Sequence, residues 1–277
     1  MISLQKEIEQ IEKLLSLADA KSVTYAALEA RLALERICYD RLRQHHDYIA
    51  YADLRRWQPG KVMNQLIEEV DTAAAQTRVI SISSNPVKDD DNLDEADFVK
   101  IGEEIGFRPS HITKLWNSLS NVALHVRLPR SRTDPIPAYP DPSQVAQKVR
   151  EALAEIKRIN ASTATMSGIG LEVTFHCECG QSNKRRADLL REGQSISCAN
   201  ASCNWSWIVR RDGDDINFQR QGVDVSCKAC GREESLPWRE IERLGYGKVA
   251  NWDCPGCNSK NLVMWQLYQA RNPQNYL

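Results

Sequence analysis

The 277-residue sequence contains no uncharged apolar run that approaches the roughly 18 residues of a membrane-spanning helix. Its first seven residues carry charges at positions where a secretory signal peptide would be apolar. We therefore expect a cytoplasmic protein that does not enter a membrane and whose thiols stay reduced. The chain also lacks an excess of either charge, and its net charge of −1 gives no general argument for a polyanionic partner.

The motifs of several large enzyme classes are missing as well. The chain has no glycine-rich phosphate loop, no nucleophile elbow and no His-Glu-x-x-His helix, so NTPase, α/β-hydrolase and zinc-protease functions have no support. The acidic run Asp89-Asp90-Asp91 is interpreted as a solvated turn. Cys38 lies between apolar helix positions and is expected to pack in a core, not to act as a nucleophile.

The cysteines are distributed unevenly. Cys38 stands alone, and no further cysteine occurs before Cys177. Clustering of thiols in a cytosolic chain indicates metal binding, because an odd number of cysteines in a reducing compartment does not form a disulfide framework. The remaining eight form four pairs: Cys177 and Cys179, Cys198 and Cys203, Cys227 and Cys230, and Cys254 and Cys257.

Two facing turns that each carry two thiolates can surround one ion. Zinc suits such a site, since it accepts four sulfurs at about 2.3 Å in a tetrahedron. The last two pairs both have two-residue gaps and resemble the turns of zinc-ribbon domains. The first two pairs have gaps of one and four residues, so His176 as a replacement ligand and unmetallated buried thiols stay open as alternatives. Iron or an iron–sulfur cluster is the alternative metal for either set.

The predicted zinc ions have a structural role. A segment of about 50 residues has too little core to fold alone, so metal binding supplies folding free energy. Four protein ligands also leave no open position for a catalytic water. We therefore predict two structural zinc ions and no zinc-dependent catalysis in this region.

Hydrophobic periodicity predicts an α+β multidomain protein. An all-α helical bundle is expected over residues 1–160, followed by a linker at 161–170 and by two small β-rich zinc ribbons at 171–221 and 222–277. Prolines interrupt the helical pattern between residues 128 and 142. Helices are predicted at residues 3–20, 24–48, from Pro59 onward, at 94–104, from a Ser110 cap to 126, and at 143–160, with a loop over 81–94.

The first predicted ribbon contains basic and aromatic residues that suit nucleic-acid binding. Such side chains can contact phosphates and stack on bases. From Glu172 onward, however, 14 Lys and Arg face 13 Asp and Glu, so any such surface must be a local patch. Docking of a partner protein is an equally good interpretation. The candidate nucleic-acid-binding residues are Lys184, Arg185, Arg186, Trp205, Trp207, Arg210 and Arg211.

Two stretches of the helical region resemble HEPN-like domains, which are small helical bundles of prokaryotic toxins, RNases and antiviral defence proteins. One is Ala-Arg-Leu-Ala-Leu-Glu-Arg-Ile-Cys at residues 30–38, and the other contains Asn121 and His125. The resemblance covers about residues 20–128 and implies a helical domain that forms a homodimer. Active members carry an Arg before the Asn, where this chain has Ser120.

The missing Arg bears on catalysis. Metal-independent RNA cleavage needs a group that handles the proton of the 2′-hydroxyl and a cation for the phosphorane charge. His125 could perform the first task, and Lys114, which shares a polar helix stripe with Asn121 and His125, could supply the cation. The alternative is that Asn121 and His125 form hydrogen bonds across a bundle or dimer interface. Arg41 and His46 form a weaker second candidate pair.

These observations predict a zinc-binding, non-catalytic adaptor or regulator that binds nucleic acid or a partner protein, in a prokaryotic defence or toxin-type system. One alternative is a metal-independent endoribonuclease that uses His125. A second alternative is a DNA-binding transcription regulator.

Overall fold

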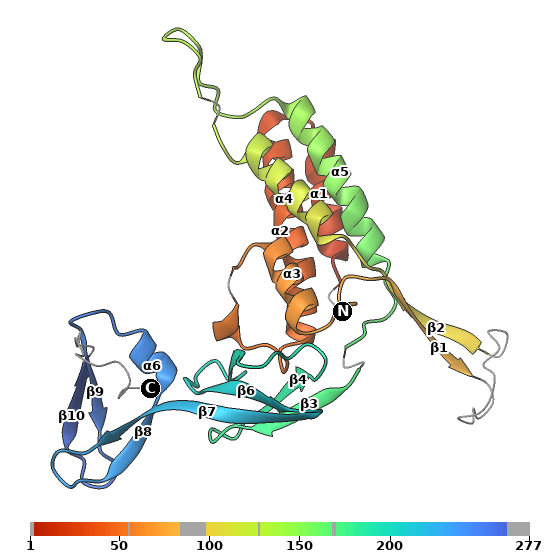
Figure 1. Cartoon of the computed structure of the whole chain (residues 1–277). Helices are drawn as coiled ribbons and strands as arrows, with labels where there is room; N and C mark the ends of the chain where they lie inside the picture. Colours follow the sequence, from red (N-terminus) through yellow and green to blue (C-terminus); the bar gives the residue numbers. More distant parts are fainter. Residues whose placement is uncertain (1–2, 55, 84–97, 127, 168–169, 265–277) are drawn as a thin grey trace. The chain divides into compact units, whose positions relative to one another are not determined.

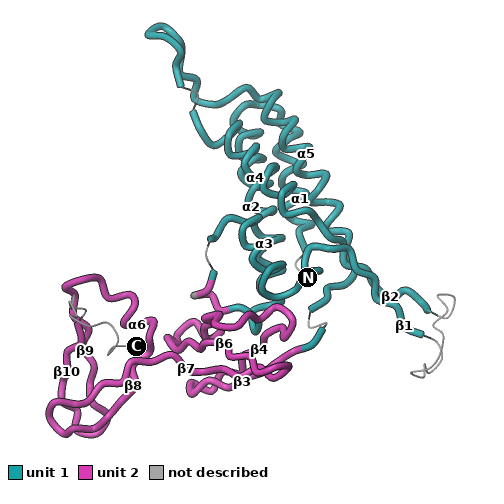
Figure 2. Tube along the Cα trace, in the orientation of Figure 1, with its two compact units in different colours: residues 1–49, 54–171 teal, residues 50–53, 172–277 magenta. Residues whose placement is uncertain are grey.

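The structure, a computed structural model, describes residues 3–54, 56–83, 98–126, 128–167 and 170–264. It divides into unit 1, which comprises Met1–Ile49 and Leu54–Leu171, and unit 2, which comprises Ala50–Asp53 and Glu172–Leu277 (Figure 2). The acidic run Asp89-Asp90-Asp91 lies outside the described residues. No helix within the described ranges has both the length and the apolar character to cross a bilayer.

Unit 1 is built around one long helix. Four alanines of this helix are fully buried, so the neighbouring helices pack close to its backbone: Ala26, Ala27, Ala30 and Ala33. Cys38 is buried in the same core, where burial raises the pKa of its thiol. The central helix α2 (Ala20–Gln44) contacts α1 (Gln5–Ser16), α3 (Pro59–Glu69), α4 (Pro109–Ala123) and α5 (Pro142–Asn160) (Figure 1).

The expectation that the N-terminal region is all-α is wrong. Strands β1 (Arg78–Ser83) and β2 (Phe98–Glu104) form an antiparallel hairpin with a register shift between Ile80 and Ser81. The helix predicted at 94–104 is therefore corrected to a strand over residues 98–104. The α4 helix also begins differently than predicted, because Arg108 is its N-cap and Pro109 is its first residue, so Ser110 is not the cap.

A buried ionic network fixes the hairpin to α2. Arg41 of α2 pairs with Glu104 at the end of β2, and both side chains are almost completely buried. Arg78 of β1 lies 3.4 Å from Glu104 and 2.9 Å from Asp71, and the imidazole Nε2 of His45 lies 3.6 Å from Asp71. Residues far apart in sequence thus supply the partners that make the strand conformation favourable here.

Unit 2 consists of hairpins that carry the cysteine pairs. Strands β3 (Glu172–His176) and β4 (Ser182–Arg186) form the first hairpin, and β9 (Val249–Asp253) and β10 (Lys260–Met264) form the last. Between them lies a sheet with the order β5 (Ser195–Ser197), β6 (Ser206–Asp212), β7 (Asp215–Ser226) and β8 (Glu233–Pro237), followed by α6 (Trp238–Glu242) (Figure 1).

The long strand β7 belongs to both ribbons. Residues 215–221 pair with β6, whereas residues 222–226 pair with β8. The ribbon boundary predicted at 221/222 thus falls inside one continuous strand, at the point where the partner changes. Gly222 occupies this point, and a Cβ there would lie 2.3 Å from the Ser235 hydroxyl and 3.3 Å from the Trp205 ring. A larger residue would have to displace the Ser235 hydroxyl, and glycine avoids this.

Residues 50–53, which include the short helix η1 (Tyr51–Asp53), belong to unit 2. The Asp53 carboxylate accepts hydrogen bonds from the Ser197 N–H at 2.9 Å and from the Ser197 hydroxyl at 2.5 Å. It also accepts from the Arg239 guanidinium at 2.7 Å. One carboxylate therefore joins β5 to α6 within unit 2.

Candidate metal centres

Each cysteine pair lies in or beside the turn of one hairpin, and the backbone of the tight turns explains their sequence. The residue after the second cysteine has a positive φ in three of the four turns: Gly180, Gly231 and Asn258. Its N–H donates to the carbonyl of the first cysteine at 2.8–2.9 Å, which closes the turn. Glycine adopts this conformation without a steric cost, and asparagine tolerates it better than most residues.

The sulfur atoms form two compact groups. In the first, Sγ of Cys177 lies 3.6 Å from Cys203, and Sγ of Cys179 lies 3.6 Å from Cys198. All four sulfurs lie within 4.8 Å of one another. A zinc ion bonded to four sulfurs at about 2.3 Å requires sulfur–sulfur distances of about 3.8 Å. The group therefore has the dimensions of a tetrahedral zinc site.

The second group has the same dimensions. Sγ of Cys227 lies 3.7 Å from Cys257, and Sγ of Cys230 lies 3.7 Å from Cys254. Disulfide sulfurs would lie about 2.05 Å apart, so these are free thiols. The two tetra-cysteine groups fit two structural zinc ions, as predicted. His176 is not part of the four-residue group in the described structure, so it is not needed as a ligand.

Hydrogen bonds favour thiolate formation at two cysteines of the second group. The Ser259 hydroxyl lies 3.1 Å from Sγ of both Cys227 and Cys257, and it lowers the pKa of both thiols. With help from backbone N–H groups, the pKa of Cys227 falls to about 5. Zinc binds thiolates, so this sulfur is ready to bind metal at neutral pH.

Burial has the opposite effect in the first group. It raises the pKa of Cys177, and it raises the pKa of Cys198 to about 11. Burial also acts on Cys179, but the backbone N–H of Gln181 and the neighbouring thiols outweigh it and lower the pKa of Cys179 to about 7. Metal binding must therefore displace protons from this group, which makes its metal affinity depend on pH.

The closed ligand sets determine what the ions can do. Four cysteines would complete the coordination of each zinc ion and would leave no position for water or substrate. The ion supplies cross-links between two turns of the chain. Its contribution at these centres is structural.

Three of the predicted nucleic-acid-binding residues are buried in unit 2. Arg185 is 4% exposed and donates to the Ser197 carbonyl at 2.7 Å, and Arg186 is 3% exposed and lies 3.4 Å from Glu172. Trp207 packs against Phe175 with ring centroids 4.9 Å apart. These side chains build the ribbon core, so they are not on a surface that nucleic acid could contact.

The other predicted residues lie nearer the surface but have partners. Lys184 lies 3.3 Å from Glu172, Arg210 lies 3.1 Å from Glu192, and Arg211 donates to the Leu190 carbonyl at 2.8 Å. Trp205 is covered by the guanidinium of Arg220, 4.4 Å from its ring centroid. A phosphate would have to compete with these contacts.

Unit 1 contains a cavity of about 950 Å³ at the C-terminal end of α4. Asn121 and His125 line it, as do Arg130 and Tyr139 from the proline-rich segment. Lys114, the cation predicted from the sequence, does not line it. Sequence reasoning missed Arg130, because the periodicity of a helix does not show where a proline-rich segment folds back.

The second candidate pair of unit 1 does not form a common site. Arg41 is buried against Glu104, whereas the His46 side chain is 68% exposed and lies 3.1 Å from Asp47. Adjacent His45 is the buried histidine, and its Nδ1 lies 2.8 Å from the Arg41 carbonyl. The Arg41 guanidinium and the His45 imidazole are therefore both engaged in structural contacts.

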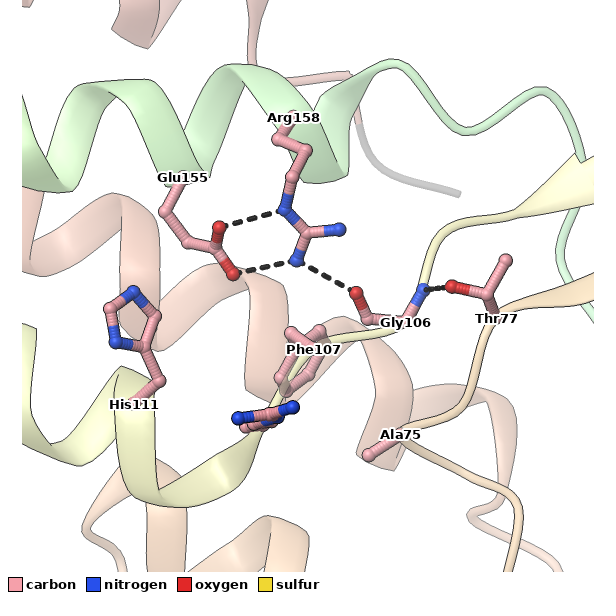
Figure 3. A pocket seen from close by; sticks show the side chains of 8 residues that line it. Ala75, Thr77, Gly106, Phe107, His111, Glu155 and Arg158 are labelled. Carbon is pink, nitrogen blue, oxygen red and sulfur yellow. Dashed lines mark hydrogen bonds and ion pairs between the residues drawn. The ribbon is translucent and has the colours of Figure 1, made fainter.

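A second cavity of unit 1, of about 480 Å³, lies where the hairpin meets α5 (Figure 3). Arg158 donates to both carboxylate oxygens of Glu155 at 2.7–2.8 Å and to the Gly106 carbonyl at 2.8 Å. Thr77 accepts the Gly106 N–H at 3.0 Å. His111 lines the same cavity, on the side of Glu155 (Figure 3). No sequence motif predicts this group of residues, whose hydrogen bonds connect the hairpin base to α5.

No known protein family matches the chain, and comparisons with curated proteins and with solved structures found no match.

Proposed function

We propose that the protein is a non-catalytic adaptor in which two zinc ions fold unit 2 into a platform that binds a partner protein. The observation that carries the proposal is the pair of closed tetra-cysteine groups, since sites of this kind organise a surface and leave no place for a reaction. The continuous strand β7 supports it, because a shared strand joins the two ribbons without a flexible linker.

The charge distribution of unit 2 favours protein over nucleic acid. Arginine and lysine side chains of the first ribbon lie beside carboxylates, including Arg210 with Glu192 and Lys184 with Glu172. A phosphate that bound these cations would have to break the ion pairs and leave the carboxylates without their partners. A nucleic-acid platform needs cations that are available to phosphates.

The last hairpin offers an apolar face that suits protein docking. Val249 of β9 and Met264 of β10 are cross-strand partners, and Leu262 lies two residues from Met264 on the same face. Their exposed fractions are 43%, 51% and 68%, respectively. Apolar side chains that gather on one exposed face are typical of protein–protein interfaces.

Affinity capture with the full-length, zinc-loaded protein tests this proposal. We expect the wild-type protein and the Ile101→Asp variant to capture the same partner protein, and the Leu262→Asp variant to fail to capture it. Ile101 is a matched control because it is an apolar residue of unit 1 with 57% exposure. Capture of nucleic acid instead, with an affinity that falls steeply as salt increases, would contradict a protein partner and support the nucleic-acid or transcription-regulator alternative.

A metal-independent endoribonuclease is the second candidate function, favoured by the cavity that joins Asn121, His125 and Arg130. His125 would accept the 2′-hydroxyl proton, and Arg130 would stabilise the phosphorane charge that Ser120 cannot. RNA cleavage in EDTA that is lost in His125→Ala, reduced in Arg130→Ala and unchanged in Lys114→Ala would establish this activity. No cleavage of structured or single-stranded RNA would exclude it in favour of the adaptor.

The resemblance of unit 1 to HEPN-like domains adds two further parts to the proposal: a homodimer formed through the helices, and a role in a prokaryotic defence or toxin-type system. Analytical ultracentrifugation tests the first part. The expected mass is that of two chains, both with and without chelator, because dimerisation through unit 1 does not depend on the cysteines. A single-chain mass at micromolar concentration would contradict it.

A further inference from the structure

Each ribbon contains one buried asparagine beside its cysteine group. Asn183 lies on β4 and is 0% exposed, and Asn261 lies on β10 and is 7% exposed. Each follows the second cysteine of its hairpin by four residues. Burying an amide costs free energy unless its donor and acceptor are both satisfied, so the partners of these side chains matter.

The amide nitrogen of each asparagine binds its own turn. Asn183 donates to the Gln181 carbonyl at 3.1 Å, and Asn261 donates to the Ser259 carbonyl at 3.1 Å. The same carbonyls accept the N–H of the first cysteine of that turn, at 2.9 Å for Cys177 and 3.0 Å for Cys254. Each asparagine therefore reinforces the hydrogen bond that closes its own cysteine turn.

The amide oxygen of each asparagine binds the opposite turn. Asn183 accepts the N–H of Ala199 at 2.7 Å, and Asn261 accepts the N–H of Lys228 at 3.0 Å. Both donors belong to the residue directly after the first cysteine of the facing pair. One side chain thus connects the two turns that supply the four sulfurs of one site.

The two ribbons reach this arrangement from opposite chain orders. In the first ribbon the asparagine follows the earlier cysteine pair and binds the later one. In the second ribbon it follows the later pair and binds the earlier one. The gaps within the cysteine pairs also differ between the ribbons. The shared contacts therefore do not follow from chain order or turn length, and what the two places have in common is the four-sulfur group.

We propose that Asn183 and Asn261 are positioning residues of the two zinc sites. Each holds its facing turns at the separation that zinc requires, so that less ordering remains to be done when the ion binds. The inference rests on zinc binding by the two tetra-cysteine groups. Groups that orient metal ligands typically change metal affinity by 10- to 100-fold when they are removed.

Asn261 has two contacts beyond the shared pattern, one of them to the Ser259 hydroxyl at 3.4 Å. Its amide nitrogen lies 3.6 Å from Sγ of Cys227, where it donates to a ligand sulfur. Asn261→Asp replaces this donor with an oxygen that repels the thiolate, in addition to losing the bond to the Ser259 carbonyl. We therefore expect Asn261→Asp to weaken its site more than Asn261→Ala does.

The test compares zinc affinity and cysteine protection in full-length variants. Competition with a chelator measures affinity, and alkylation followed by peptide mass spectrometry reports on each cysteine separately. Asn183→Ala is expected to lower the zinc affinity of one site at least tenfold and to expose only Cys177, Cys179, Cys198 and Cys203 to alkylation. Asn261→Ala is expected to do the same for Cys227, Cys230, Cys254 and Cys257.

Exposed strand asparagines of the same ribbons serve as controls, since Asn217→Ala and Asn251→Ala each remove an amide from the exposed face of a strand. Cobalt(II) titration adds a spectroscopic readout. Each Asn variant is expected to bind one cobalt ion with the affinity of wild type and a second cobalt ion more weakly than wild type does. Asn183→Asp keeps the acceptor for the Ala199 N–H but places a carboxylate oxygen against the Gln181 carbonyl, so it is also expected to weaken the first site and to leave the second unchanged.

The possible failures are distinguishable. Variants with the affinity and protection of the controls would overturn the positioning role while leaving the zinc sites intact. Equal loss of protection at all eight cysteines in both Asn183→Ala and Asn183→Asp would overturn it as well, because the effect would then be unfolding of the whole unit. Wild-type protein that binds no zinc would refute the sites themselves.

Discussion

The hydroxyl of the single residue Ser259 favours the thiolate form of two cysteines in the second group. It contacts Cys227 and Cys257 at 3.1 Å and lowers the pKa of both. Because protons compete with zinc for thiolates, a lowered pKa lets the site keep its metal to a lower pH. We predict that Ser259→Ala shifts the midpoint of zinc release to higher pH.

A pH titration of zinc release with a colorimetric chelator checks this prediction. Ser226→Ala is the matched control, since Ser226 is an exposed serine at the end of β7 in the same ribbon. Equal midpoints for wild type and both variants would show that the hydroxyl does not tune the site.

A second prediction concerns Asp71, which belongs to the buried ionic network of unit 1. Burial would raise its pKa, but hydrogen bonds from His45 and the Ala73 N–H and the charge of Arg78 outweigh burial and lower the pKa to about 2. The stabilisation is therefore complete above the unfolded pKa near 3.9 and is lost as pH falls from about 4 toward 2. It is on the order of 2 kcal/mol.

Chemical denaturation of wild type and Asp71→Asn tests the sign. The difference between their free energies of unfolding is expected to be large at pH 7 and to shrink by pH 3. A difference that does not depend on pH would mean that Asp71 is not held ionised by its neighbours.

At the element scale, β7 is the strand on which the arrangement of unit 2 depends. In a Gly222→Ala variant the added Cβ would lie 2.3 Å from the Ser235 hydroxyl and 3.3 Å from the Trp205 ring. The Ser235 hydroxyl can rotate away, but the Leu236 carbonyl and the Trp205 ring remain 3.3 Å from the added Cβ, so we expect a cost of about 1 kcal/mol. We expect a lower melting temperature of the zinc-loaded protein, with no change for Asp224→Ala, an exposed substitution on the same strand. Equal melting of the two variants would contradict tight packing at this point.

The elements also show what the sequence could and could not reveal. Cysteine spacing predicted both metal groups because each pair of ligands is local and its turn has a recognisable sequence. Helical periodicity likewise found α3 and α5. The β1–β2 hairpin was missed because β2 ends at Glu104, whose buried partner Arg41 lies far away in the sequence on α2.

The positively charged residues of the first ribbon show that exposure is also hard to predict from sequence. Charge predicted that Arg185 and Arg186 would be exposed, yet both are buried, Arg185 against the Ser197 carbonyl and Arg186 against the Glu172 carboxylate. Sequence composition counts charges but does not show which of them are already paired.

For the whole molecule, the two units are expected to respond differently to metal removal. Unit 1 has a large core of buried aliphatic residues, whereas unit 2 has a small core beside its first cysteine group. Zinc therefore supplies a large part of the folding free energy of unit 2 alone. We predict that chelation lets a protease degrade residues 172–264 while a fragment of about residues 1–171 survives.

Limited proteolysis with mass spectrometry, with and without chelator, measures this directly, and circular dichroism should retain most of its helical signal. Simultaneous loss of both units on chelation would show that unit 1 also depends on the metal.

Metal stoichiometry tests the central claim of the molecule most directly. Elemental analysis of the folded, desalted protein should find two zinc ions per chain, one in a Cys227→Ser/Cys254→Ser variant, and none when Cys177 and Cys198 are also replaced by serine. Well under one metal ion per chain in folded wild-type protein would contradict the two tetra-cysteine zinc centres and the platform built on them.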